Sequence, residues 1–366
     1  MQLLQQQVLW AALALGIAFG AIAQRTHFCT MGALADIVNM GDWQRLRMWV
    51  LAIGVAMLGF NAMVGAGMVK ASNSIYAGPA LLWLSQVVGG LMFGFGMVLA
   101  SGCGSKTLVR IGGGNLKSLV VFVVLGVSAF ATLKGITAVA RVATLDTVAL
   151  TLATGQDLPS LLAAATGTSK PLLALLLGGS IGGGLVAWSL VRAEGRAPNN
   201  LLAGVGVGAI ITAVWWVSGR LGHLAEDPNT LQEAFVATNS QRMESLSFVA
   251  PVAYTLDWLM FFSDKSKVLT TGIVAVVGVV AGSAVSALSQ GSFRWEGFGR
   301  TEDVANHLIG GALMGVGGVT AMGCTIGQGL SGLSTLSLTS FVAVTAIIFG
   351  AVAALHYQIW RMEQTE

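Results

Sequence analysis

Long apolar stretches separated by short polar breaks dominate the sequence. A helix needs about 20 mostly apolar residues to cross a bilayer. Nine stretches meet this length clearly, and a tenth candidate, 246–262, is ambiguous. It contains Pro251 and Asp257 and ends in aromatic residues, so it either crosses or lies along the membrane interface. The pattern predicts an all-α polytopic membrane protein with nine to ten transmembrane helices. The nine clear stretches are 8–23, 48–69, 80–100, 118–133, 171–191, 201–217, 268–289, 306–322 and 336–357.

Composition excludes a water-soluble protein. Only 10% of the residues are charged and 55% are hydrophobic, whereas soluble domains carry about 25% charged residues. We therefore expect a single transmembrane domain over residues 1–366. No Lys or Arg precedes the first apolar run, which favours a retained first helix over a cleaved signal peptide. The basic residues divide almost evenly between the two faces, so they predict no orientation.

Motifs for other functions are missing from the sequence. It contains no phosphate-binding loop, no HExxH, no CxxC and no histidine cluster. We therefore predict no cofactor, no metal site, no nucleic-acid partner and no enzymatic activity. The more polar regions 141–170 and 219–247 are expected to form short helices or external loops.

An internal repeat organises the chain. Sliding the sequence by 221 positions gives seven identities without a gap, five of them between glycines. We place the two copies at about 80–140 and 300–357. If 246–262 does not cross, the copies run in opposite directions; if it crosses, they run parallel. We expect the inverted arrangement, because it brings two broken helices face to face at the midplane. The matched pairs are Gly89/Gly310, Gly90/Gly311, Gly94/Gly315, Gly96/Gly317, Ala100/Ala321, Gly102/Gly323 and Cys103/Cys324.

Each of the three cysteines lies where an apolar run gives way to a break. Gly102 and Gly323 directly precede Cys103 and Cys324, and Cys29 also follows a glycine-containing apolar segment. Irregular backbone at membrane depth is tolerated only where it is buried or lines a cavity, so the breaks predict re-entrant helices and a solute site. A neutral thiol is a weak donor with a polarisable sulfur, suited to loose binding of a sulfur-containing anion. An isolated cysteine in a membrane helix also serves as a small apolar filler.

Charged and polar side chains near the breaks have two interpretations. Arg25, Lys106 and Arg110 either hold an anion at a pore mouth or extend to lipid headgroups. Gln328 either lines a path or bridges helices. We expect Asp36 to pair with Arg25.

At these residues the chain resembles the YeeE/YedE family of bacterial inner-membrane proteins, which is implicated in thiosulfate uptake. The matching strings are Gln24-Arg25-x-x-Phe28-Cys29-x-x-Gly32 with Asp36, Gly102-Cys103 followed by Arg110-x-Gly112, and Gly323-Cys324-x-Ile326-Gly327-Gln328-Gly329-Leu330. The resemblance covers essentially the whole chain, and Ser105-Lys106 departs from the small neutral residues expected after the second cysteine.

The resemblance implies an hourglass-like protein with a central constriction, in which three cysteines pass thiosulfate along by thiol hydrogen bonds. Here they would be Cys29, Cys103 and Cys324. It also implies a cytosolic sulfur-carrier partner of the TusA-like type in some members. Some relatives are associated with selenium metabolism, which leaves another sulfur or selenium compound open as the substrate.

Two functional hypotheses follow. The first is a transporter or facilitator in the inner membrane for a small sulfur-containing anion, most simply thiosulfate. The second is a membrane sulfurtransferase or redox protein that uses a cysteine persulfide or a transient disulfide. A covalent relay needs a thiolate, which a nearby cation stabilises, and only Cys103 with Lys106 offers one. The expected path residues are Cys29, Cys103, Cys324, Arg25, Lys106, Arg110, Gln328, Gly102 and Gly323.

Overall fold

The protein is almost entirely helical. The computed structural model describes residues 2–228 and 230–364. The helices are α1 (Gln2–Thr26), α2 (Thr30–Met40), α3 (Gln44–Gly65), α4 (Trp83–Leu99), α5 (Gly104–Gly112), α6 (Leu116–Lys134), α7 (Ile136–Thr144), α8 (Leu158–Thr166), α9 (Lys170–Val191), α10 (Pro198–Trp216), α11 (Ala250–Met260), α12 (Thr271–Ser289), α13 (Thr301–Thr320) and α14 (Leu338–Glu363). Short helical turns are η1 (Ala71–Asn73), η2 (Ala193–Arg196), η3 (Val217–Leu221) and η4 (Gly327–Gly332), and two-residue strands are β1 (Ala80–Leu81), β2 (Leu150–Thr151), β3 (His223–Leu224) and β4 (Ala234–Phe235).

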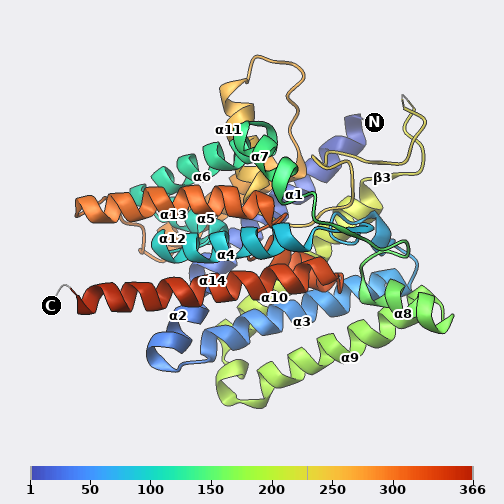
Figure 1. The fold of residues 1–366 in the computed structure, drawn as a ribbon, viewed down its shortest axis with the longest axis horizontal. Helices are drawn as coiled ribbons and strands as arrows, with labels where there is room; N and C mark the ends of the chain where they lie inside the picture. The colour runs from blue at the N-terminus through green and yellow to red at the C-terminus, as the bar shows by residue number, and fades with distance from the viewer. Residues whose placement is uncertain (1, 229, 365–366) are drawn as a thin grey trace.

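The helices form a polytopic membrane bundle. In the described part of the chain, eight helical segments are long and apolar enough to cross a membrane. The 20-residue helix α13 lies in the same bundle, packed between α4 and α6, although charged residues begin it. Figure 1 shows α13, α4, α14, α3 and α9 running along the longest axis of the molecule.

The tenth predicted segment does not cross. Helix α11 occupies its centre but has only 11 residues. At 1.5 Å per residue such a helix is about 16 Å long, roughly half of the hydrocarbon thickness. An odd number of crossings therefore separates the two repeat copies, as the inverted arrangement requires.

Helix α4 and helix α13 pack antiparallel through their glycines. Gly89, near the start of α4, contacts Gly317 near the end of α13, and Gly96 contacts Gly310. The repeat relates Gly89 to Gly310 and Gly96 to Gly317. The repeat therefore maps the Gly89–Gly317 contact onto the Gly310–Gly96 contact, which is the signature of a two-fold relation within one chain.

The outer faces of the two helices repeat the same relation. Gly94 of α4 packs against Ile347 of α14, and its counterpart Gly315 of α13 packs against Leu125 of α6. The last helix of each copy therefore packs against the first helix of the other copy. Glycine allows this close backbone approach in membrane helices, where van der Waals packing rather than hydrophobic burial drives association.

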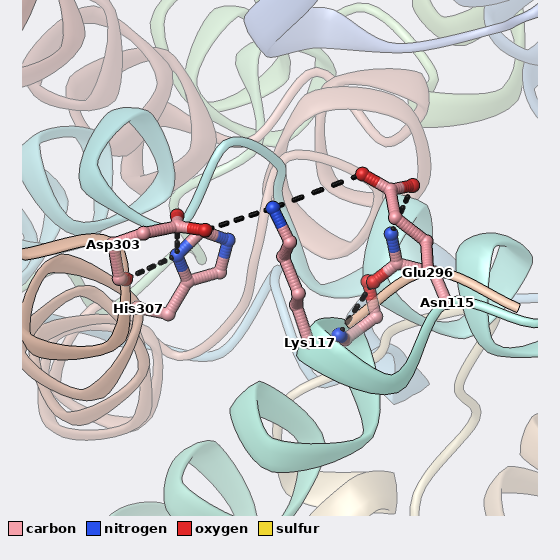
Figure 2. Close-up of polar contacts among 6 residues, drawn as sticks. Asn115, Lys117, Glu296, Asp303 and His307 are labelled. Carbon is pink, nitrogen blue, oxygen red and sulfur yellow. Dashed lines mark hydrogen bonds and ion pairs between the residues drawn. The ribbon is translucent and has the colours of Figure 1, made fainter. Parts of the chain in front are cut away.

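An ionic network joins the starts of α6 and α13 (Figure 2). Lys117 Nζ lies 2.8 Å from Asp303 Oδ2 and 3.8 Å from Glu296 Oε1, and Asn115 Nδ2 donates to Glu296 Oε2 at 2.7 Å. His307 Nδ1 lies 3.0 Å from Asp303 Oδ1. The network ties the connection before α13 to the first turn of α6 at one end of the bundle.

The polar regions fold outside the long helices, as predicted. Region 141–170 forms the end of α7, strand β2 and α8, and β2 pairs antiparallel with β1. Region 219–247 forms the end of η3 and the β3–β4 pair, which is also antiparallel. The last part of region 219–247 is buried and is not the external loop that was predicted: Met243 and Leu246 are 1% and 4% exposed, and Ser245 Oγ donates to the carbonyl of Ile211 at 3.0 Å.

Candidate functional site

The three cysteines follow backbone breaks of the same shape. The residue two positions before each cysteine has a left-handed conformation, with φ of +54° at His27, +56° at Ser101 and +55° at Met322. Residues other than glycine seldom adopt this conformation. Its occurrence at three matching positions shows that the surrounding packing holds the chain in these turns.

Each turn closes the preceding helix with the same hydrogen bond. The N–H of the next residue donates to a carbonyl five positions earlier, from Phe28 to Ala23 at 3.2 Å and from Gly323 to Gly318 at 2.8 Å. Gly102 donates in the same way at 2.8 Å, to Met97. This is the Schellman ending of a helix, with His27, Ser101 or Met322 at the position that glycine usually takes.

The cysteines then begin the next segment. Cys29 precedes α2 and Cys103 precedes α5, each as the capping residue with extended backbone. Cys29 Sγ accepts the N–H of Gly32 at 3.4 Å, and Cys324 Sγ accepts the N–H of Gly327 at 3.4 Å. The sulfurs thus replace the side-chain oxygens that usually cap helices.

The structure brings the three cysteines together. All are free and buried, with exposed fractions of 8% for Cys29, 1% for Cys103 and 0% for Cys324. Cys103 lies between the other two: the thiols of both Cys29 and Cys324 are within electrostatic range of it, and it faces the hydroxyl of Thr325, the residue after Cys324. Cys103 Sγ also lies 3.3 Å from Ser105 Oγ. The sequence order therefore becomes a spatial row.

Cations gather at the Cys29 end of the row. Lys106 is half-buried, and its charge acts on both Cys29 and Cys103. Arg110 and Arg45 lie within electrostatic range of Lys106. The missing side chain at Gly102 makes room for Lys106, whose Cγ would lie 3.2 Å from a Cβ at that position. Three basic side chains therefore gather at this end of the row.

One predicted pairing is wrong. Asp36 binds Arg45, with Arg45 Nε 3.1 Å from Asp36 Oδ2, rather than Arg25. The left-handed turn at Gly41 ends α2 and returns the chain, so the start of α3 lies beside α2. Arg25 stays exposed in the last turn of α1, four residues before Cys29.

Gln328 braces the break at Cys324. Its Nε2 donates to the carbonyl of Ala321 at 2.6 Å, and its Oε1 accepts the hydroxyl of Ser340 at 2.7 Å. The side chain is fully buried and packs against Gly323. Of the two interpretations from sequence, these contacts describe bridging between helices.

A cavity of about 270 Å³ lies beside the break that precedes Cys324. It reaches Met322 and Gly323, which directly precede Cys324, and Arg141, Tyr254 and Glu244 also line it. Glu244 accepts hydrogen bonds from Thr271 Oγ1 at 3.0 Å and Ser240 Oγ at 2.9 Å. Burial raises the pKa of its carboxyl group. This cavity gives the Cys324 end a vestibule that carries an acid.

Sequence reasoning missed Arg45 and Glu244. Arg45 lies 16 positions after Cys29 and reaches the site only through the turn at Gly41. Glu244 stood in a segment assigned to external loops. A charged residue close to a predicted helix boundary was the only available signal for either. Among the described residues, no group of three His, Cys, Asp or Glu side chains is arranged to hold a metal ion.

Comparison with known proteins decides the family. The model of the family described as "Sulphur transport" matches residues 25–353, from the last turn of α1 into α14. The chain belongs to the sulphur transport family. The cysteine motifs predicted membership of the YeeE/YedE family, and the family match confirms this prediction. The match includes all three cysteine breaks and extends into both repeat copies.

Curated members of this family are named as transporters. The chain is 27% identical over 357 residues to the thiosulfate transporter TsuA of Escherichia coli, covering 94% of this chain and 93% of that protein. It is 24% identical over 360 residues to TsuA of Spirochaeta thermophila, covering 94% and 97%. The probable transporter YedE of Salmonella typhimurium is 31% identical over 107 residues, 29% of this chain and 25% of its own length. These names describe transporters rather than enzymes.

Proposed function

We propose that the protein carries thiosulfate, or a closely related sulfur oxyanion, across the bacterial inner membrane. The anion steps between the neutral thiols of Cys29, Cys103 and Cys324 without covalent chemistry. The relatives named as thiosulfate transporters support the substrate. The order of the steps in either direction follows the row, with Cys103 in the middle.

The convergence of three buried, free thiols carries this proposal. A buried cysteine used only as filler has no reason to meet two others from breaks that are far away in the sequence. Thiols are weak donors, and several weak sites in series let a solute enter and leave. The row therefore supports passage better than tight binding.

The surrounding charges support an anionic solute. Lys106, Arg110 and Arg45 lie near the Cys29 end, where an anion would exchange hydration for fixed positive charge. The starts of α2 and α5, directly after Cys29 and Cys103, add the positive ends of their helix dipoles.

Reconstitution tests the proposal directly. The purified protein in lipid vesicles should take up radiolabelled thiosulfate, and Cys29→Ala, Cys103→Ala and Cys324→Ala should each abolish uptake. Ser189→Ala is the matched control, because it also removes a small buried side-chain group, on α9 away from the breaks. Cysteine variants with normal uptake and normal folding would exclude the thiol row as the path.

One observation favours the sulfurtransferase or redox alternative. Cys29, Cys103 and Lys106 lie together, and a cation beside a thiol stabilises a thiolate. In a covalent relay the cysteine thiolate would attack the outer sulfur of thiosulfate, break its S–S bond and expel sulfite, leaving a persulfide that adds about 32 Da, the mass of one sulfur atom. Intact-mass analysis during uptake should show no such species under the transport hypothesis; a steady adduct on Cys103 would favour the alternative.

The cytosolic partner and the exact substrate are also proposals. The family resemblance implies a TusA-like sulfur carrier that would remove the anion after entry. Co-purification of such a carrier with the full-length protein tests this interaction. Growth of a sulfur-starved host on thiosulfate, compared with sulfate and selenite, separates thiosulfate from other sulfur and selenium anions.

A further inference from the structure

Three buried hydroxyl groups on segments next to the cysteine breaks have no oxygen or nitrogen hydrogen-bond partner within the described chain, and the only group that faces the Thr325 hydroxyl there is the weakly bonding thiol of Cys103. They belong to Thr30, Tyr76 and Thr325, whose exposed fractions are 3%, 0% and 2%. Leaving a buried hydroxyl unpaired costs roughly 1–3 kcal/mol. Native proteins seldom accept this cost without a ligand or water that satisfies the group.

Two of the hydroxyls occupy equivalent positions beside cysteines. The sequence Cys-Thr-x-Gly occurs at 29–32 and again at 324–327. In both, the glycine N–H donates to the cysteine sulfur, so the local geometry is shared. The Thr325 hydroxyl faces the Cys103 thiol, which places it between the second and third cysteines.

The break explains why these threonines lack partners. A threonine inside a helix normally donates to the carbonyl four residues earlier, as Thr320 does to Val316 at 2.8 Å. Thr30 and Thr325 follow directly after a helix has ended, so no carbonyl of the same helix is in place to accept. Their hydroxyls are left available for something else.

Tyr76 brings the third hydroxyl from a distant segment. Its carbonyl accepts Gln156 Nε2 at 2.8 Å and Ser337 Oγ at 2.6 Å, and its ring packs edge-on to Trp215 with centroids 6.2 Å apart. The hydroxyl lies 3.2 Å from where a Cβ on Gly327 would stand. The phenol is therefore held rigidly beside the turn that caps Cys324.

We propose that the hydroxyls of Thr30, Tyr76 and Thr325 bind the oxygen atoms of the transported anion, while the neighbouring thiols hold its sulfur end. This inference rests on the proposed transport function and specifies its ligand class. The ligand is an oxyanion that carries a terminal sulfur. Hydroxyl donors match the hard oxygens and thiols match the soft sulfur, so the paired groups select a molecule with both ends.

The test removes one hydroxyl at a time in the full-length protein in lipid vesicles. Thr30→Val, Thr325→Val and Tyr76→Phe each delete the oxygen with little change of volume. Each should raise the thiosulfate concentration for half-maximal uptake by about tenfold, as expected for one lost hydrogen bond to a charged ligand. Thr325→Ser, which keeps the hydroxyl, should stay near wild type.

Thr320→Val is the matched control. It removes a buried hydroxyl that is bound within its own helix, one turn before the same break, and it should leave the concentration dependence unchanged. Tyr76→Phe keeps the test informative if a valine variant fails to fold. Hydroxyl variants that behave like wild type would overturn this inference and leave the transport function standing. A wild-type protein without thiosulfate uptake would overturn both.

Discussion

A carbon atom attached to the Cα of Gly89 would lie 2.7 Å from the carbonyl oxygen of Gly317, and one attached to Gly317 would lie 2.6 Å from the carbonyl oxygen of Gly89. Neither distance leaves room for a methyl group against backbone atoms, which cannot move aside cheaply. The contact between the two repeat copies therefore depends on the absence of side chains at both positions.

Alanine at either glycine should loosen the α4–α13 contact. We expect Gly89→Ala and Gly317→Ala each to destabilise the protein by about 1–3 kcal/mol, the usual cost of overpacking. Gly184→Ala on α9 is the control, because its Cβ would meet no atom within 4 Å, and alanine stabilises a helix by roughly 0.5–1 kcal/mol relative to glycine. Thermal unfolding in detergent, followed by circular dichroism, measures the difference. Equal melting temperatures for all three variants would contradict the packing argument.

Serine at Cys324 should separate folding from transport. The Cys324 sulfur accepts the N–H of Gly327, and a serine oxygen caps such a group at least as well. Cys324→Ser should therefore fold like wild type and yet transport thiosulfate several-fold more slowly, because its hydroxyl is a harder donor than a thiol. Uptake rate and melting temperature are measured on the same preparation. Full activity in the serine variant would mean that sulfur is not needed at this position.

Lys106→Ala should weaken the attraction of the anion without closing the path. The apparent affinity for thiosulfate should fall, and its dependence on ionic strength should become shallower, because a fixed charge has been removed. Lys134→Ala, at the exposed end of α6, is the charge-matched control. Uptake measured over a range of thiosulfate and salt concentrations provides both quantities. An unaltered concentration dependence would show that Lys106 only anchors the helix to the interface.

Uptake should rise in mildly acidic solution through Glu244. Burial raises the pKa of this carboxyl group above its ordinary value, so it gains its proton at a higher pH than an exposed glutamate. Protonation removes a negative charge from the cavity next to Gly323 and thus lowers the repulsion of an anion. Tyr254, which shares the cavity, keeps its proton over this range because burial raises the pKa of its phenol.

Glu244→Gln should abolish this pH response and give the higher uptake at neutral pH. Glu226→Gln, which changes an exposed carboxyl in the same region of the chain, should keep the wild-type profile. Initial uptake rates between pH 5 and 8 at constant ionic strength decide the matter. The idea fails if the wild-type rate is flat over this range.

The repeat and the cysteine breaks were predictable because glycine and cysteine act locally. Close backbone contact requires glycine at equivalent positions of both copies, such as Gly89 and Gly310. The repeat can therefore be recognised in the sequence from glycines at a fixed offset. Helix α11 was ambiguous because Pro251 and Asp257 allow either a short helix or a crossing. Its length of 11 residues and the antiparallel contact between α4 and α13 decided for an inverted repeat.

Residues that reach the site from other elements were not predictable. Tyr76 comes from the connection between α3 and α4, and Glu244 from the connection between α10 and α11. The residues around Tyr76 and Glu244 in the sequence give no indication that these side chains lie near a cysteine. The Asp36 pairing was wrong for the same reason, since the partner depends on how the turn at Gly41 directs α3.

The two ends of the cysteine row carry unlike charge. Lys106, Arg110 and Arg45 stand at one end, whereas the cavity near Gly323 contains one carboxyl, Glu244, together with one cation, Arg141. Under the proposed function, an anion inside the row would therefore experience a standing electric field along its route, directed by the excess of positive charge at one end. Such a passage rectifies: at equal concentrations on both sides, flux would be larger in one direction under an applied voltage of one sign than under its opposite. The symmetry of the backbone thus does not extend to its electrical behaviour.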